Sequence, residues 1–94
     1  MIKIYAERTV KQENIEAYKT LGSQLVAASQ AEEGCISYTL NQCLEDPCVF
    51  AFIEIWKDME AIKCHNATEH FTTLVPQMGA LCSAKAPVKL FHEV

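Results

Sequence analysis

The segment Cys48-Val49-Phe50-Ala51-Phe52-Ile53-Glu54-Ile55-Trp56-Lys57 decides the expected fold, because it is apolar at nearly every position. In a β-strand, successive side chains point to opposite faces. One face of this strand would carry the aromatic residues and the single acid Glu54, whereas the other would carry only aliphatic residues. Because a sheet with one solvated face alternates apolar and polar residues, this pattern predicts that both faces of the sheet are covered.

The N-terminal half predicts two strands and one long helix. Residues 2–10 alternate as a strand, with Arg8 among the residues of the more apolar face. Residues 12–31 carry apolar side chains at three- and four-residue steps, which is typical of an amphipathic helix. Residues 35–43 are rich in Ile, Tyr and Thr and predict a second strand. The turn that follows, at 44–47, contains Asp-Pro, a pair that favours turn initiation.

The C-terminal half predicts a short helix, a longer helix and a last strand. Asp58 is a suitable N-cap for a helix over 59–65, and Thr68 for the next helix. Pro76 predicts either a kink in that longer helix or a later start for it. Residues 87–93 predict the final strand. The expected apolar stripe of the longer helix comprises Phe71, Leu74, Val75, Met78, Leu81 and Cys82.

The order β-α-β-β-α-β is that of the ferredoxin-like fold, an α+β plan in which an antiparallel sheet carries its helices on one face. A chain of 94 residues has room for one core, so residues 1–94 are expected to form a single domain. Its helices can cover only one face of the sheet. We therefore expect a homodimer packed sheet against sheet, a dimeric α+β barrel. The alternative is a monomer with some exposed aliphatic residues.

Composition excludes several classes of function. The chain has 8 Lys and Arg against 12 Asp and Glu, whereas a nucleic-acid-binding domain needs a basic surface. No apolar stretch approaches the roughly 20 residues of a membrane span. The first residues alternate like a strand and do not resemble a signal peptide. We expect a cytoplasmic protein that binds neither nucleic acid nor membrane.

The five cysteines are expected to be reduced thiols. Their number is odd, no C-x-x-C pair occurs, and none of their spacings is typical of a zinc site. Cys43 and Cys48 flank the predicted turn and could face each other across it, so whether these two pair is left open. The chain also lacks a glycine-rich phosphate loop and a nucleotide fingerprint, so no cofactor is expected.

Glu54 is the first candidate for a catalytic group. If its strand face looks toward the helices, this carboxyl lies among aromatic side chains, and desolvation raises its pKa. A carboxyl in that state can act as a general base or acid. The alternative is a position near the sheet edge, where Glu54 is solvated or paired with Arg8.

His65 and His70 are the second candidates, as proton shuttles near neutral pH. In a continuous helix they would point about 140° apart, and no third ligand is evident, so no metal site is expected. A structural role, such as His65 capping helix carbonyls, is the alternative. The single tryptophan, Trp56, is expected either in the core or in the wall of a pocket for a flat ligand.

Taken in order along the chain, these features resemble the antibiotic biosynthesis monooxygenase family. The resemblance covers nearly the whole chain and is strongest to the quinol-monooxygenase-like and autoinducer-2-phosphate-isomerase-like branches. It rests on Val10-Lys11, Ala31-Glu32-Glu33-Gly34-Cys35 followed by Tyr38, Asp46-Pro47, Glu54-x-Trp56-x-Asp58-x-Glu60-Ala61, His65 and His70-Phe71.

The resemblance implies a monooxygenase that acts on a quinol-like or polyphenolic substrate without flavin, haem or metal. The protein would help to remove a phenolic proton, and the resulting anion would react directly with dioxygen in a dry pocket. If the family's polar groups near the substrate are placed at the matching positions of this chain, the catalytic residues would be His65, Glu54 and His70. Haem-degrading members look to have an Asn on the first strand and a Trp near the position of His65. Ala6 and His65 stand there in this chain, which argues against haem degradation.

The resemblance also implies the substrate-binding residues. Trp56 would form the pocket wall, and Arg8 could hold an oxyanion or a phosphate. Two alternative functions stay open: an isomerase of a small phosphorylated keto sugar, and a non-catalytic small-molecule-binding protein. The expected apolar lining comprises Phe50, Phe52 and Phe71.

Overall fold

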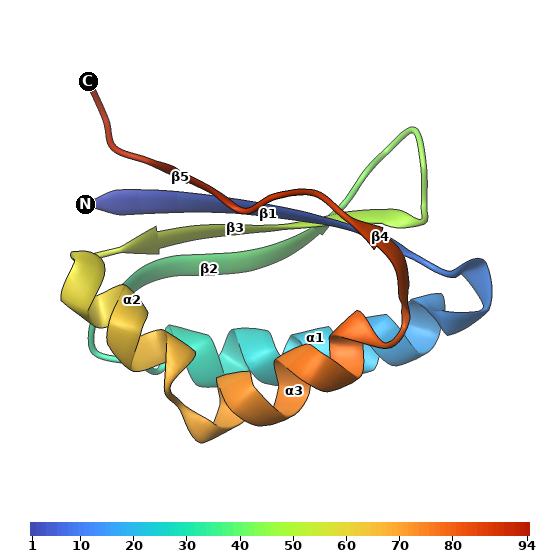
Figure 1. Ribbon diagram of the computed structural model, residues 1–94, viewed down its shortest axis with the longest axis horizontal. Helices are drawn as coiled ribbons and strands as arrows, with labels where there is room; N and C mark the ends of the chain where they lie inside the picture. Colours follow the sequence, from blue (N-terminus) through green and yellow to red (C-terminus); the bar gives the residue numbers. More distant parts are fainter.

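The computed structural model describes all 94 residues and has two layers, a five-stranded antiparallel sheet and a layer of helices on one face (Figure 1). Strands β1 (Ile2–Val10) and β3 (Val49–Trp56) pair at its centre, and β2 (Cys35–Gln42) forms the edge beside β3. On its other side, β1 pairs with β4 (Cys82–Lys85) and then with β5 (Lys89–Phe91). The ferredoxin-like α+β fold predicted from the sequence is confirmed.

The helical layer begins with a short 3-10 helix, η1 (Gln12–Asn14), which leads into α1 (Ile15–Gln30). Helices α1 and α3 (Glu69–Gly79) lie under the sheet, and α2 (Met59–Asn66) lies at the end where β3 finishes (Figure 1). None of these helices is long and apolar enough to cross a membrane.

The two predicted N-caps are confirmed. The Asp58 carboxylate accepts a hydrogen bond from the amide of Ala61 at 2.9 Å, and Thr68 Oγ1 accepts one from the amide of Phe71 at 3.2 Å. Each cap satisfies an amide that has no partner within its own helix. Thr68 lies between α2 and α3, so its cap starts a new helix directly after α2 ends.

The C-terminal expectations need three corrections. Helix α3 begins at Glu69, before Pro76, so the expectation of a later start is wrong. The helix ends at Gly79, so Leu81 lies outside it and Cys82 begins β4, opposite Val10 of β1. The single strand expected over 87–93 is instead the short β5, and together β4 and β5 cover the two halves of β1.

Strand β3 has the two faces that its sequence indicated. Phe50, Phe52, Glu54 and Trp56 point toward the helices and are buried. The opposite face carries no helix, and Ile53 on it is 45% exposed (Figure 1). Since β3 lies between β1 and β2, Glu54 is an interior residue of the sheet and not an edge residue.

Candidate active site

A cavity of about 290 Å³ lies between the sheet and the helices α1 and α3. Its lining is mostly apolar, from Ala6 and Phe52 on the sheet to Pro76 and Met78 on α3. The polar residues that reach it are Arg8, Tyr18, Tyr38, Glu54 and Lys85. An apolar cavity with a few converging polar groups is the usual form of a small-molecule site.

Glu54 is the one carboxyl group in this cavity, and it is only 6% exposed. Burial raises the pKa of Glu54 to about 7, a change that the nearby carboxylate of Glu32 reinforces and that Arg8 opposes. The indole N–H of Trp56 donates a hydrogen bond to Glu54 Oε1 at 2.8 Å, which also holds the pKa down. A carboxyl with a pKa near neutrality is suited to accept a proton from a bound ligand.

Arg8 supplies positive charge at the cavity without pairing directly with Glu54. Its Nη1 donates to the backbone carbonyls of Glu7 at 2.8 Å and Ala86 at 3.4 Å, which fixes the guanidinium on the sheet. Lys85 of β4 lines the same cavity. A buried acid and two cations thus line the cavity. The acid can accept a proton from a bound ligand, and the cations can stabilise the anion that results.

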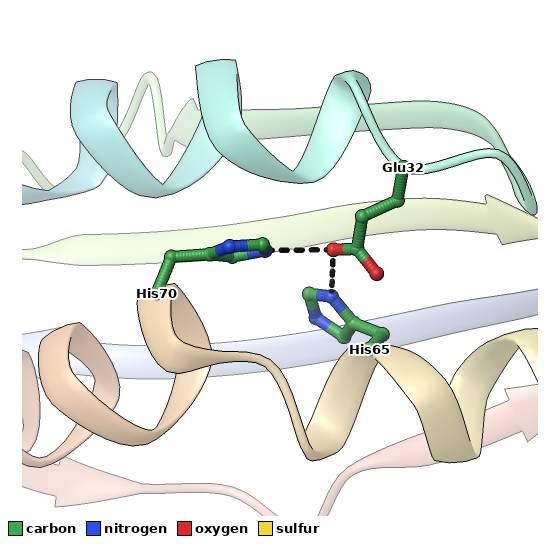
Figure 2. Close-up of side chains that lie close together, drawn as sticks. All are labelled: Glu32, His65 and His70. Carbon is green, nitrogen blue, oxygen red and sulfur yellow. Dashed lines mark hydrogen bonds and ion pairs between the residues drawn. The ribbon is translucent and has the colours of Figure 1, made fainter.

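A second cluster is formed by Glu32, His65 and His70, whose side chains point toward one another (Figure 2). None of the three lines the cavity. One carboxylate oxygen, Glu32 Oε2, is 2.6 Å from Nδ1 of His65 and 2.8 Å from Nε2 of His70. His65 is in the last turn of α2 and His70 in the first turn of α3, and Glu32 lies just after α1. The break between α2 and α3 therefore turns the two imidazoles toward one group, which a continuous helix would not do.

Trp56 connects the cavity to this cluster. Its side chain is fully buried and its ring lies 4.4 Å from the ring of His65, centroid to centroid, while its N–H reaches Glu54. Burial lowers the pKa of His65, and the hydrogen bond to the Glu32 carboxylate opposes this change without reversing it. Trp56 is part of the core and acts as a bridge, since it does not line the cavity itself.

The structure divides the predicted site residues into separate groups. Glu54, Arg8 and Phe52 line the cavity, whereas His65 and His70 do not. Phe71 packs on His65 with ring centroids 5.0 Å apart. The remaining aromatic residue of the expected lining, Phe50, faces a different surface depression of about 570 Å³, which offers no carboxylate or histidine.

Sequence reasoning assigned no role to Glu32 or Tyr38, although both stand in the motif that carried the resemblance. Glu32 lies 33 residues before His65, so only the fold brings the two together. Tyr38 lines the cavity from β2, and burial raises the pKa of its hydroxyl, which keeps it neutral. The thiols of Cys43 and Cys48 are both free.

Gly34 fixes the loop that carries Glu32 against helix α2. A methyl group on Gly34 would lie 2.3 Å from Cβ of Ala61 and 3.3 Å from its Cα, so the loop and the helix would have to separate. We expect Gly34→Ala to lower the free energy of unfolding by about 1–3 kcal/mol, measured by urea denaturation. Gly79→Ala is the matched control, because a methyl group there meets no atom within 4 Å. Equal stability of the two variants would contradict this packing.

Comparison with known proteins assigns the chain to a family. Residues 1–77 match the family model described as antibiotic biosynthesis monooxygenase. The chain belongs to the antibiotic biosynthesis monooxygenase family. It is similar to YcnE of Bacillus subtilis (strain 168), with 38% identity over 88 residues that cover 94% of this chain and 93% of YcnE.

Solved structures with the same fold include two that match nearly the whole chain. A crystal structure of an antibiotic biosynthesis monooxygenase has a TM-score of 0.95 and 38% identity, and the match covers 100% of this chain and 99% of the other. A conserved protein from Methanosarcina mazei Go1 also gives a TM-score of 0.95, at 27% identity, with 99% and 92% covered. The family match includes Glu32, Glu54 and both histidines, whereas Lys85 lies beyond it.

Proposed function

We propose that the protein is a monooxygenase that oxidises a small quinol or polyphenol with dioxygen in the cavity beside Glu54. The observation that carries this proposal is the buried carboxyl with a pKa of about 7 at an apolar cavity, in a chain of the antibiotic biosynthesis monooxygenase family. The cavity of about 290 Å³ has room for a small aromatic ring rather than a large polycyclic ligand.

In the proposed reaction, the ionised carboxylate of Glu54 accepts a proton from a phenolic hydroxyl of the substrate. The guanidinium of Arg8, which lines the same cavity, stabilises the phenolate. The electron-rich phenolate reduces dioxygen, and one oxygen atom forms a bond to a ring carbon while the O–O bond breaks. The second oxygen atom leaves as water, so a quinol and dioxygen give a hydroxyquinone and water, and the reaction needs no added reductant.

An oxygen electrode tests this proposal directly. The purified protein, dialysed against a chelator, is mixed with a panel of benzene- and naphthalene-derived quinols, and oxygen uptake and product mass are followed. We expect saturable uptake and a product that has gained one oxygen atom and lost two hydrogen atoms relative to the quinol. A folded protein that accelerates oxygen uptake with no member of the panel would contradict the proposal and favour the non-catalytic alternative.

We also propose that two copies of the chain pack through the helix-free face of the sheet. Apolar side chains are exposed on this face, and a partner that covered them would remove apolar surface from water. Tyr5 is 37%, Ile53 45% and Phe91 52% exposed. The connection between β2 and β3 rises on the same side of the sheet, and in it Leu44 is 99% exposed (Figure 1). A second copy is the partner that the symmetry of small oligomers favours.

We expect Ile53→Lys to abolish the dimer, because a charge would then be buried at the centre of the sheet-to-sheet contact. Analytical ultracentrifugation should give twice the 10.5 kDa chain mass for the unmodified protein and the chain mass for the variant. Thr20→Lys adds the same charge on the exposed side of α1 and should leave the dimer intact. An unmodified protein that sediments as a single chain would contradict this proposal.

The two cations support a second candidate function, isomerisation of a small phosphorylated keto sugar. Arg8 and Lys85 could hold the phosphate while Glu54 moves a proton between neighbouring carbons through an enediolate. Phosphate binding that is lost in Arg8→Ala, combined with the absence of quinol-dependent oxygen uptake, would favour this function over the oxygenase.

A further inference from the structure

The geometry of Glu32, His65 and His70 points to a metal-binding site, and we propose that these side chains bind one divalent transition-metal ion such as Zn²⁺. The ligand atoms would be one carboxylate oxygen and two imidazole nitrogens. The sequence offered no third ligand for the two histidines, which is why no metal site was expected from it. Glu32, brought in by the loop after α1, is that third ligand (Figure 2).

The three donor atoms already lie close to the positions that an ion requires. Glu32 Oε2, His65 Nδ1 and His70 Nε2 all lie within 4.8 Å of one another. In a tetrahedral zinc site, bond lengths of about 2.0–2.2 Å place neighbouring ligand atoms about 3.3 Å apart. The carboxylate oxygen lies 2.6 and 2.8 Å from the two nitrogens, so a small outward shift of Glu32 would make room for the ion.

The surroundings hold at least one ligand in place. His65 is 2% exposed, and its ring packs against Trp56 at 4.4 Å and Phe71 at 5.0 Å between centroids. His70 is 23% exposed on the side chain and Glu32 14%, so a fourth position can be taken by water. A fixed ligand beside two that can adjust suits a site with one open position.

The charge around the cluster also favours a cation. Glu32 forms ion pairs only with the two imidazoles, and no lysine or arginine lies within bonding distance of it. A surface groove of about 440 Å³ runs along Glu32 and is lined by Glu33, Asp58 and Glu60, with Lys57 as its one cation. Three further carboxylates against one ammonium attract a dication toward Glu32.

Binding would require each histidine to change the position of its proton. Each ring faces Glu32 Oε2 through one nitrogen, and because a carboxylate only accepts hydrogen bonds, that nitrogen must carry a proton to bond to it, whereas a metal ligand must offer a lone pair from the same nitrogen. The proton can move to the other ring nitrogen, so each histidine binds in its neutral form. Since the three ligands come from three segments, a bound ion would tie the α2–α3 break to the loop after α1.

Isothermal titration of the chelator-treated protein with ZnCl2 tests this proposal. We expect one equivalent to bind with a Kd tighter than about 0.1 mM. Glu32→Gln and His70→Gln should each weaken binding at least about 10-fold, and Zn²⁺ should raise the melting temperature of the unmodified protein but not of these variants. His92→Gln and Cys64→Ser are the controls. His92 is an exposed histidine that is not part of the cluster, and Cys64 is a possible competing ligand because it lines the acidic groove.

Three results would overturn the proposal: binding of the unmodified protein weaker than about 0.1 mM, binding by Glu32→Gln and His70→Gln equal to that of the unmodified protein, or loss of binding in Cys64→Ser. The last would assign the ion to the thiol. Because the cluster lies outside the cavity, this outcome is independent of the oxygen-uptake assay.

Discussion

Glu54→Gln should lower kcat/KM for quinol-dependent oxygen uptake by about 10²–10⁴-fold, the range that general-base catalysis supplies. The amide keeps the size of the side chain and can still accept the hydrogen bond from Trp56, but it cannot take the phenolic proton. For the unmodified protein, kcat/KM should rise as the pH increases through about 7, because the carboxylate is the active form and its pKa is about 7.

The control for this substitution is Glu13→Gln, since Glu13 is exposed and lies outside the cavity. Its rate and its pH profile should match those of the unmodified protein. The rise in rate near pH 7 should be absent from Glu54→Gln. If Glu54→Gln retained both the rate and the pH profile, another group would have to accept the proton, and the proposed mechanism would be wrong.

The raised pKa of Glu54 also predicts how the stability of the fold depends on pH. Folding raises this pKa from its ordinary value of 4.5 to about 7, so between these pH values the folded chain holds a proton that the unfolded chain has released. The free energy of unfolding therefore falls as the pH rises through this interval, by on the order of 3 kcal/mol at most. Glu54→Gln should remove this dependence.

Trp56→Ala should have the largest effect on stability, a loss of about 3–5 kcal/mol in the free energy of unfolding. The indole is fully buried and contacts the cavity carboxyl, the ring of Tyr38 and the ring of His65, so its removal opens a void in the core. Small domains have only about 5–15 kcal/mol to lose. Urea denaturation followed by circular dichroism measures the difference.

Trp56→Phe separates packing from hydrogen bonding. It retains an aromatic ring in the core but removes the N–H that donates to Glu54 Oε1 at 2.8 Å. Because that bond holds the pKa of Glu54 down, its loss should move the rise in kcat/KM to higher pH. A variant with an unchanged pH profile would show that the indole acts only through its volume.

Local pattern was sufficient to predict most of the fold, because β3 and the capped helices are specified by neighbouring residues. The two faces of β3 and the caps Asp58 and Thr68 all follow from rules that operate within one or two turns. The C-terminal strands did not follow from such rules. β4 is four residues long and is stabilised mainly by its pairing with β1, a contact between the two ends of the chain.

The site was predictable only in part for the same reason. Glu54 among aromatic residues on one strand face is a local feature, and its burial follows from the position of β3 inside the sheet. The partnership of Glu32 with His65 and His70 depends on a loop and on a helix break that are far apart in sequence. Their spacing in a continuous helix predicted that the two imidazoles point apart, whereas in the fold both contact one carboxylate oxygen.

The pKa of Glu54, measured in the folded protein without any substrate, tests the central claim most directly. Carboxyl ¹³C shifts of glutamate-labelled protein, compared with those of Glu54→Gln, identify the Glu54 signal and follow its titration. A pKa of about 7 is expected, which is the value that burial among the aromatic residues produces. A pKa near the ordinary 4.5 would mean that Glu54 is hydrated, and the account of a buried proton acceptor in this cavity would fail.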